Sequence, residues 1–277
     1  MKKFKVGVQL YSVRDQMEKD LPATLRAVKE IGYDYVEFAG YFGRSAEELR
    51  ALLDEIGLTC ISVHQGLDFY EQGGQSAVDY IKTLGARFSA IPWYEVSKLP
   101  GSPAWEETRA LFVRNGELLK KNGVQMLYHN HDFEFVKIGE KYRHDIMMEE
   151  ISHDLMLPEF DTCWVRYAGE DPCRYLAKYT GEVEVVHLKD FTCKRLADGP
   201  AYALIDATGK PIESEKKEDN EFRFRPLGQG MQDFPAILAA AEKAGTEYVI
   251  VEQDQSYDQP SLEAIKESRE YLASLGL

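Results

Sequence analysis

The chain has 277 residues, with 33 Lys and Arg against 47 Asp and Glu and a formal net charge of -14. Its hydrophobic share of 44% and charged share of 29% are those of an ordinary globular chain, which excludes a fibrous or largely disordered protein. The excess of acidic residues argues against a nucleic-acid partner, because phosphate binding depends on Lys and Arg. We therefore expect a small-molecule ligand.

No apolar run approaches the roughly 18 residues that a helix needs to cross a bilayer. The first residues are basic, but polar groups interrupt each apolar stretch before a secretory segment could reach its usual length. We therefore expect a cytoplasmic protein without a membrane partner. The sequence does not fix the oligomeric state, and a homo-oligomer is compatible with it.

Short apolar runs alternate with longer amphipathic segments, as in repeated βα units around a parallel sheet. The expected strands are residues 5–10, 33–38, 59–63, 88–92, 125–129, 156–161, 184–188 and 248–252. The expected helices are residues 21–31, 46–56, 75–84, 105–122, 145–152, 172–179, 234–244 and 262–275. Because these units follow one another without a linker, the pattern favours a single α/β domain, a (β/α)8 TIM barrel, over an open doubly wound sheet of about five or six strands.

The predicted domain spans residues 1–277 and carries an insertion at about 192–225, after the seventh strand. The interval between the seventh and eighth strands is roughly twice the length of one βα unit. The insertion contains a mixed-charge run at 213–221, which cannot supply a buried face. We expect a solvated excursion or a short hairpin at the barrel rim, and a lid over the site is the alternative.

In a barrel of this kind, the C-terminal ends of the strands converge on one mouth. Residues of the type that binds metals or moves protons stand at, or just after, the ends of six expected strands. They are Glu37, His64, His129, His131, Glu134, Asp161, His187, Lys189 and Glu252. Four of the six histidines are among them. No glycine-rich phosphate fingerprint follows any strand, which argues against a nucleotide site.

A divalent metal site is the chemistry that these residue types support. Asp161, His187 and Glu252, with a His or Glu after the fifth strand, would offer imidazole and carboxylate ligands from separate strands. Such a mixed nitrogen and oxygen set suits Mn²⁺, Co²⁺, Zn²⁺ or Mg²⁺. Open positions on the ion would leave room for substrate oxygens. We therefore expect one divalent metal ion.

The order of the strand-end motifs resembles the sugar phosphate isomerase/epimerase family of xylose isomerase-like TIM barrels, which also contains inosose dehydratases and endonuclease IV. The motifs are Val-Glu-Phe at 36–38, Tyr-His-Asn-His-Asp-Phe-Glu-Phe at 128–135, Phe-Asp-Thr-Cys-Trp at 160–164, His-Leu-Lys-Asp at 187–190, Pro-Leu-Gly-Gln-Gly at 226–230 and Val-Glu-Gln-Asp at 251–254. The resemblance implies one ion, often manganese or cobalt, held by His129, Asp161, His187 and Glu252. It also implies a carbohydrate substrate: a keto-sugar, a sugar phosphate or an inosose.

The fifth strand departs from the family pattern. Members commonly carry Glu-Asn-His where this chain has His129-Asn130-His131. In the epimerases that glutamate is expected to work with the strand-eight glutamate, here Glu252, from opposite faces of the substrate. Glu134 could fold back to replace it. Otherwise His131 offers a base suited to neutral pH, because imidazole titrates near pH ~6.5.

The expected reaction is proton abstraction next to a carbonyl, with His131 as the base. Lys189 would bind a substrate hydroxyl or phosphate, or else pair with Asp190 or another rim carboxylate. Isomerisation, epimerisation and β-elimination from an inosose or a 3-keto-glycoside share this first step, and the sequence does not choose among them. The expected substrate-binding residues are Glu37, His64, Trp93, Trp164 and Gln229.

Several of these residues have a plainer interpretation. Tryptophans more often pack in a core than contact a ligand. The segment containing Gln229 is either a turn with two glycines or a row of backbone donors facing substrate. Two other classes of protein also remain: a non-catalytic sugar-binding barrel, since fold does not dictate function, and a nuclease, which the acidic charge disfavours.

Overall fold

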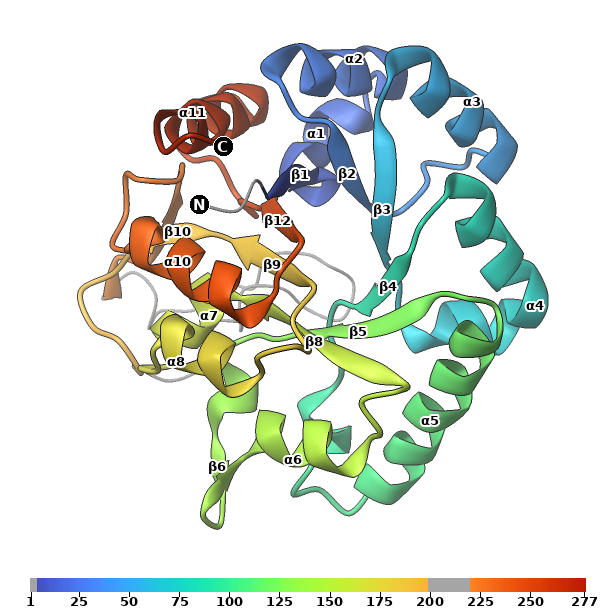
Figure 1. The fold of residues 1–277 in the computed structure, drawn as a ribbon, viewed down its shortest axis with the longest axis vertical. Helices are drawn as coiled ribbons and strands as arrows, with labels where there is room; N and C mark the ends of the chain where they lie inside the picture. Colours follow the sequence, from blue (N-terminus) through green and yellow to red (C-terminus); the bar gives the residue numbers. More distant parts are fainter. Residues whose placement is uncertain (1–3, 199–219) are drawn as a thin grey trace.

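Eight parallel strands form a closed barrel in the order β1-β12-β9-β8-β5-β4-β3-β2. The computed structural model describes residues 4–198 and 220–277. The barrel strands are β1 (Lys5–Gln9), β2 (Tyr35–Ala39), β3 (Thr59–His64), β4 (Phe88–Ile91), β5 (Gln125–His129), β8 (Met156–Asp161), β9 (Val185–Leu188) and β12 (Tyr248–Val251). Figure 1 shows them at the centre with the helices outside. The predicted (β/α)8 barrel is therefore confirmed.

The outer helices follow the barrel strands in turn. They are α2 (Leu21–Ile31), α3 (Ala46–Ile56), α4 (Leu67–Leu84), α5 (Trp105–Lys121), α6 (Arg143–Glu150), α8 (Pro172–Lys178), α10 (Phe234–Ala244) and α11 (Ser261–Ser274). Helix α3 begins with a capping box between Ser45 and Glu48 and ends at Gly57, which has a left-handed φ of 79°. Such local signals explain why the predicted bounds of α2, α3 and α10 match the structure.

Other elements differ from the prediction. Helix α4 begins at Leu67 rather than at residue 75, because the chain is already helical before a kink at Gly74. The sequence analysis missed the short helices α1 (Arg14–Met17) and α7 (Thr162–Tyr167) and the hairpin of β6 (Lys137–Ile138) and β7 (Lys141–Tyr142). These pieces are too short to show a hydrophobic period.

Apolar side chains from the barrel strands form a separate cluster: Ile61, Phe88, Ala90, Leu127, Val185, Tyr248 and Ile250. Side chains two positions apart in a strand point to the same side of the sheet. His129 follows Leu127 by two positions in β5, and His187 follows Val185 by two positions in β9. His129 and His187 therefore lie on the side of the sheet that carries this cluster.

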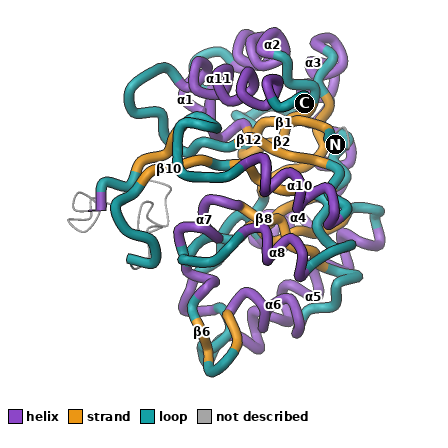
Figure 2. Tube along the Cα trace, turned by 60° about the vertical axis from the view of Figure 1, so that its left-hand side comes forward, coloured by secondary structure: helices purple, strands orange, loops and turns teal. Residues whose placement is uncertain are grey.

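The insertion after β9 begins and ends in a hairpin. Strand β10 (Asp190–Thr192) pairs antiparallel with β11 (Arg223–Arg225), and Figure 2 shows β10 at the edge of the barrel. An antiparallel strand pair thus stands at the base of the insertion, and the expectation of a solvated excursion or a short hairpin at the rim stays a prediction. Most of the mixed-charge run, residues 213–219, lies outside the described residues. The assignment of the whole chain to one domain stays a prediction.

None of the helices in residues 4–198 and 220–277 combines the length and the apolar character needed to span a membrane.

Asp190 fixes the loop between β11 and α10. Its carboxylate accepts hydrogen bonds from the backbone N–H groups of Gly228 and Gly230, both at 2.9 Å, and of Gln232 at 3.2 Å. Residue 230 must be glycine, since a Cβ there would lie 2.2 Å from Asp190 Oδ1. Of the two interpretations of residues 226–230, the structure supports the turn, because its backbone donors face Asp190.

The substitution Asp190→Asn should destabilise the fold by about 2 kcal/mol, because the amide group would face backbone donors and leave at least one of them without an acceptor. Urea unfolding of the two proteins measures this difference. The exposed Asp34→Asn serves as the control and should change stability by less than about 0.5 kcal/mol. Equal unfolding midpoints for Asp190→Asn and the unsubstituted chain would show that the loop does not depend on this carboxylate.

Candidate metal centre

Four buried side chains from four barrel strands meet at the mouth of the barrel, and we call them the His129 tetrad. They are His129 at the end of β5, Asp161 at the end of β8, His187 within β9 and Glu252 directly after β12. One ligand-type atom of each lies within 4.8 Å of those of the other three. The sequence analysis named these same four residues, and the structure brings them together.

The tetrad is held by contacts within it and by the start of α7. His129 Nε2 lies 3.4 Å from Asp161 Oδ2 and 3.4 Å from Glu252 Oε2. His187 Nδ1 lies 2.9 Å from Glu252 Oε2. Asp161 Oδ1 accepts hydrogen bonds from the backbone N–H groups of Cys163 and Trp164, at 2.8 and 3.2 Å, and caps α7. The other oxygen, Oδ2, is thereby turned toward His129.

The tetrad fits a divalent cation. His129 is only 3% exposed, yet neither of its ring nitrogens has a hydrogen-bond partner among the described residues. Buried polar atoms normally have a partner, so an imidazole placed between two carboxylates indicates a site for a positive ion. Two imidazoles with two carboxylates suit Zn²⁺, Mn²⁺ or Co²⁺ better than Mg²⁺, which prefers an all-oxygen shell.

Lys189 supplies a fixed positive charge beside the tetrad. Its Nζ lies 2.9 Å from Asp161 Oδ2, from Glu252 Oε2 and from Asp254 Oδ1, and the residue is 1% exposed. Burial lowers the pKa of Lys189, but these carboxylates outweigh it and raise the pKa well above its usual value. Of the two expectations for Lys189, the structure shows the ion pair. The sequence analysis gave Asp254 no role, although it stands two positions after Glu252.

The electrostatics of the tetrad favour positive charge. Burial lowers the pKa of His187, but the carboxylates of Glu159 and Glu37 outweigh it and raise the pKa well above the usual value for histidine. Burial raises the pKa of Glu252, but Lys189 and His187 outweigh it and lower the pKa well below its usual value. Glu252 therefore stays ionised, and its negative charge favours either a protonated histidine or a metal cation beside it.

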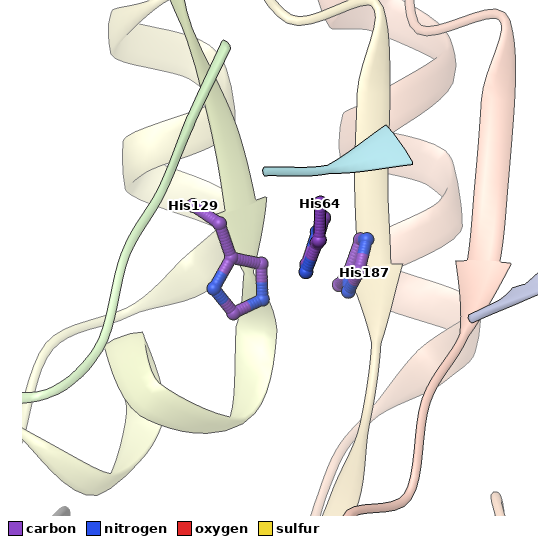
Figure 3. A group of neighbouring side chains, drawn as sticks. All are labelled: His64, His129 and His187. Carbon is purple, nitrogen blue, oxygen red and sulfur yellow. The ribbon is translucent and has the colours of Figure 1, made fainter. Parts of the chain in front are cut away.

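A second buried group, the Glu37 tetrad, shares His187 with the first. It consists of Glu37, His64, Glu159 and His187. His64 Nε2 lies 3.2 Å from Glu37 Oε2 and 3.0 Å from Glu159 Oε2. Figure 3 shows the rings of His129, His64 and His187 next to one another. The rings of His64 and His187 are stacked, with centroids 5.3 Å apart.

Two residues that the sequence suggested for substrate binding contact protein groups in the Glu37 tetrad. Glu37 Oε2 and His64 Nε2 lie 3.2 Å apart there, and contact of either residue with a substrate stays a prediction. Sequence reasoning missed Glu159. The signal that could have found it is the strand period, because Glu159 stands two positions before Asp161 in β8 and points to the same side.

His131 lies at the edge of the His129 tetrad. Its ring centroid is 5.1 Å from that of His129, and the ring is stacked on Phe133 at 5.4 Å. Burial lowers the pKa of His131 well below its usual value, and the nearby charges of His129 and Lys189 lower it further. His131 is therefore a neutral imidazole.

Glu134 does not join either tetrad. Its Oε1 accepts a hydrogen bond from the Tyr128 hydroxyl at 2.7 Å, and its Oε2 accepts one from the backbone N–H of His131 at 2.8 Å. The expectation that Glu134 folds back to replace the family glutamate therefore gains no support. Its carboxyl group instead holds the segment that carries His131.

Three predicted substrate-binding residues remain, and they lie at different distances from the His129 tetrad. Trp164 is fully buried, with Lys189 Nζ 5.3 Å from its ring and the His131 ring 5.7 Å away. Trp93 is half-buried against the hydrophobic core. Gln229 is exposed, and its side chain donates to Glu267 on α11 at 2.8 Å. Only Trp164 of these three is placed beside the His129 tetrad.

The fold and the site together define the class of this protein. It is a parallel (β/α)8 barrel whose strand ends carry a candidate centre for a divalent cation, built from histidines and carboxylates. Residues 25–275 match the family model described as Xylose isomerase-like TIM barrel, and the chain belongs to this family.

Relatives of known structure or name agree with this assignment. The chain is 24% identical over 266 residues to an inosose dehydratase of Geobacillus kaustophilus (strain HTA426), covering 83% of this chain and 79% of that protein. A sugar phosphate isomerase/epimerase from Parabacteroides distasonis ATCC 8503 has a TM-score of 0.78 at 20% identity, covering 98% and 94% of the two chains. The IOLI protein, solved with a bound zinc atom, has a TM-score of 0.68 at 15% identity, covering 98% and 97%. The predicted resemblance is confirmed, and the relatives named here include a dehydratase and an isomerase/epimerase, the types that the resemblance implied.

Glu134 should make the stability of the fold depend on pH. Burial raises its pKa from 4.5 to about 7, although Tyr128 and His131 donate to it. The folded chain then holds a proton that the unfolded chain has lost, so stability falls as pH rises from about 4.5 to about 7, by about 1.4 kcal/mol per pH unit.

Glu134→Gln removes this titration and keeps an acceptor for His131. Between pH 4.5 and 7.5 the variant should therefore gain about 3 kcal/mol relative to the unsubstituted chain. Urea unfolding at several pH values measures the difference, with the exposed Glu107→Gln as the control that should show no such trend. A constant difference between Glu134→Gln and the unsubstituted chain would contradict the raised pKa.

Proposed function

We propose that this protein is a metal-dependent enzyme that removes a proton from the carbon next to a carbonyl in a keto-sugar, a sugar phosphate or an inosose. The observation that carries the proposal is the His129 tetrad, whose four ligand-type atoms lie within 4.8 Å of one another at the barrel mouth. Membership of the xylose isomerase-like family and the inosose dehydratase relative support a carbohydrate substrate.

One divalent ion would be held by His129, Asp161, His187 and Glu252. When bound, it would polarise the substrate carbonyl and an adjacent hydroxyl as a Lewis acid. The zinc atom of the IOLI protein supports a transition metal, and the donor set accepts Zn²⁺, Mn²⁺ or Co²⁺. We favour manganese or cobalt on the family resemblance.

His131 is the proposed base. A base must be unprotonated before it acts, and burial keeps the His131 imidazole neutral by lowering its pKa. The Phe133 ring stacked on it and the backbone held by Glu134 fix its position. A ring nitrogen of His131 would take the proton from carbon, and the Lys189 ammonium would stabilise the negative charge that develops on the substrate.

Elimination is the second candidate reaction. After the same proton is removed, a hydroxyl or alkoxy group on the β-carbon leaves with the electron pair, takes up a proton and departs as water or an alcohol. Two observations favour it over simple epimerisation: His129 stands where epimerases commonly have a glutamate, and the relative from Geobacillus kaustophilus is an inosose dehydratase. A proton acceptor on one face is sufficient for this reaction, whereas epimerisation needs groups on two faces.

The metal centre is tested by binding. After removal of metal by a chelator, the chain should take up about one equivalent of Mn²⁺, Co²⁺ or Zn²⁺ and unfold at a higher temperature, because the ion binds only the folded state. Glu252→Gln should keep the fold but bind at least about tenfold more weakly. Elemental analysis and thermal unfolding measure both effects. Less than about a tenth of an equivalent in the unsubstituted chain, with no stabilisation by Mn²⁺, would favour a non-catalytic sugar-binding barrel.

The base is tested by proton exchange. In deuterated water, the metal-loaded enzyme should exchange the proton next to the carbonyl in at least one of a panel of keto-sugars, inososes and 3-keto-glycosides. His131→Asn should slow this exchange by about 10² to 10⁴, while the exposed His153→Asn should not change it. NMR follows the exchange and identifies the product. Unchanged exchange in His131→Asn would show that His131 is not the base.

A further inference from the structure

His187 is the residue shared by both tetrads, and its two ring nitrogens face different partners. Nδ1 lies 2.9 Å from Glu252 Oε2, in the His129 tetrad. Nε2 lies 2.7 Å from Glu37 Oε2 and 3.6 Å from Glu159 Oε1, in the Glu37 tetrad. The Glu37 tetrad is therefore either a second cation site or a support for the first.

The chemistry of imidazole decides between these alternatives. A neutral imidazole has one nitrogen that can bind a cation and one N–H that donates. If His187 binds an ion through Nδ1, its Nε2 keeps the proton. The nearest acceptor is Glu37 Oε2 at 2.7 Å, a contact that lacks hydrogen-bond geometry as the ring now stands and would need a small turn of the ring to gain it. A second ion on Nε2 would require His187 to lose that proton as well. A single ion with a hydrogen-bonded acceptor behind the ring needs no such loss.

We propose that Glu37 is a positioning residue of the metal centre: it accepts the Nε2–H of His187 and thereby presents Nδ1 to a single ion in the His129 tetrad. The Glu37 tetrad then holds no ion of its own. This inference rests on the metal site of the proposed function. A carboxylate behind a metal-binding histidine fixes the ring and its tautomer and strengthens the nitrogen as a ligand.

The fold holds Glu37 in this place from both neighbouring strands. Gln9 at the end of β1 donates to Glu37 Oε2 at 2.8 Å, and His64 at the end of β3 lies 3.2 Å from the same oxygen. The register between β2 and β3 shifts between Val36 and Glu37. Irregularities of this kind re-aim side chains near functional sites. Glu37 is fully buried, and its Oε2 lies beside Gln9, His64 and His187.

Glu159 provides a matched control. Glu37→Gln and Glu159→Gln make the same chemical change at two fully buried positions that both contact His64. The two carboxylates differ in their distance to His187 Nε2, which is 2.7 Å for Glu37 and 3.6 Å for Glu159. If the substitutions only disturb the buried cluster, both variants should lose metal affinity to a similar extent. If Glu37 positions His187, Glu37→Gln alone should lose it.

The first measurement is the affinity for Zn²⁺ and Co²⁺ by competition with a coloured chelator. The unsubstituted chain should bind one ion per chain. Glu37→Gln should still bind one ion but about 10- to 100-fold more weakly, and the visible spectrum of its Co²⁺ form should shift. Glu159→Gln should lose less than about tenfold and keep the spectrum. Thermal unfolding of the metal-free proteins checks that both variants fold.

The second measurement is the position of the His187 proton in the Zn²⁺-loaded chain, read by long-range proton–nitrogen NMR. The proposal predicts a proton on Nε2. A proton on Nδ1, two ions per chain, or a Glu37→Gln variant that binds Zn²⁺ as tightly as the unsubstituted chain would each overturn it. Absence of any binding by the unsubstituted chain would contradict the proposed metal site itself, which separates the two failures.

Discussion

The mouth of the barrel depends on one constraint: carboxylates removed from water must be balanced by positive charge. Glu37, Glu159, Asp161 and Glu252 are each 5% exposed or less. Burying an ionised carboxylate costs several kcal/mol unless a cation or hydrogen-bond donors accompany it. Lys189 supplies one fixed charge. The remaining carboxylates must be neutralised by protons on the histidines or by a metal ion.

This balance explains why the histidines lie where they do. His187 stands between the two tetrads, with one ring nitrogen near Glu252 and the other near Glu37. An ion in the His129 tetrad would replace protons there, while the hydrogen bonds of the Glu37 tetrad would stay in place. His131 lies just outside this arrangement and is neutral, which suits a group that must accept a proton. The same charges thus suit different histidines to different proposed roles: binding the ion, contacting the carboxylates of the Glu37 tetrad, or accepting a proton.

Much of the fold and the composition of the His129 tetrad could be predicted from the sequence. The strand ends follow from apolar runs, and three of the ligands follow from the rule that strand ends meet at one mouth, whereas the choice of His129 came from the family resemblance. The rest depends on contacts that no local pattern records. Asp190 turns away to bind the backbone of residues 228–232, and Glu134 turns back to Tyr128. Glu159 was missed although the strand period places it on the same side as Asp161, because that period does not show which histidines it will meet.

We expect one cation to bind where the four side chains of the His129 tetrad converge. Anomalous X-ray diffraction from a crystal loaded with Mn²⁺ or Zn²⁺ would locate it. A single anomalous peak should lie within about 2.0–2.3 Å of ligand atoms of His129, Asp161, His187 and Glu252. A peak between Glu37, His64 and Glu159, or no peak at the barrel mouth, would contradict it.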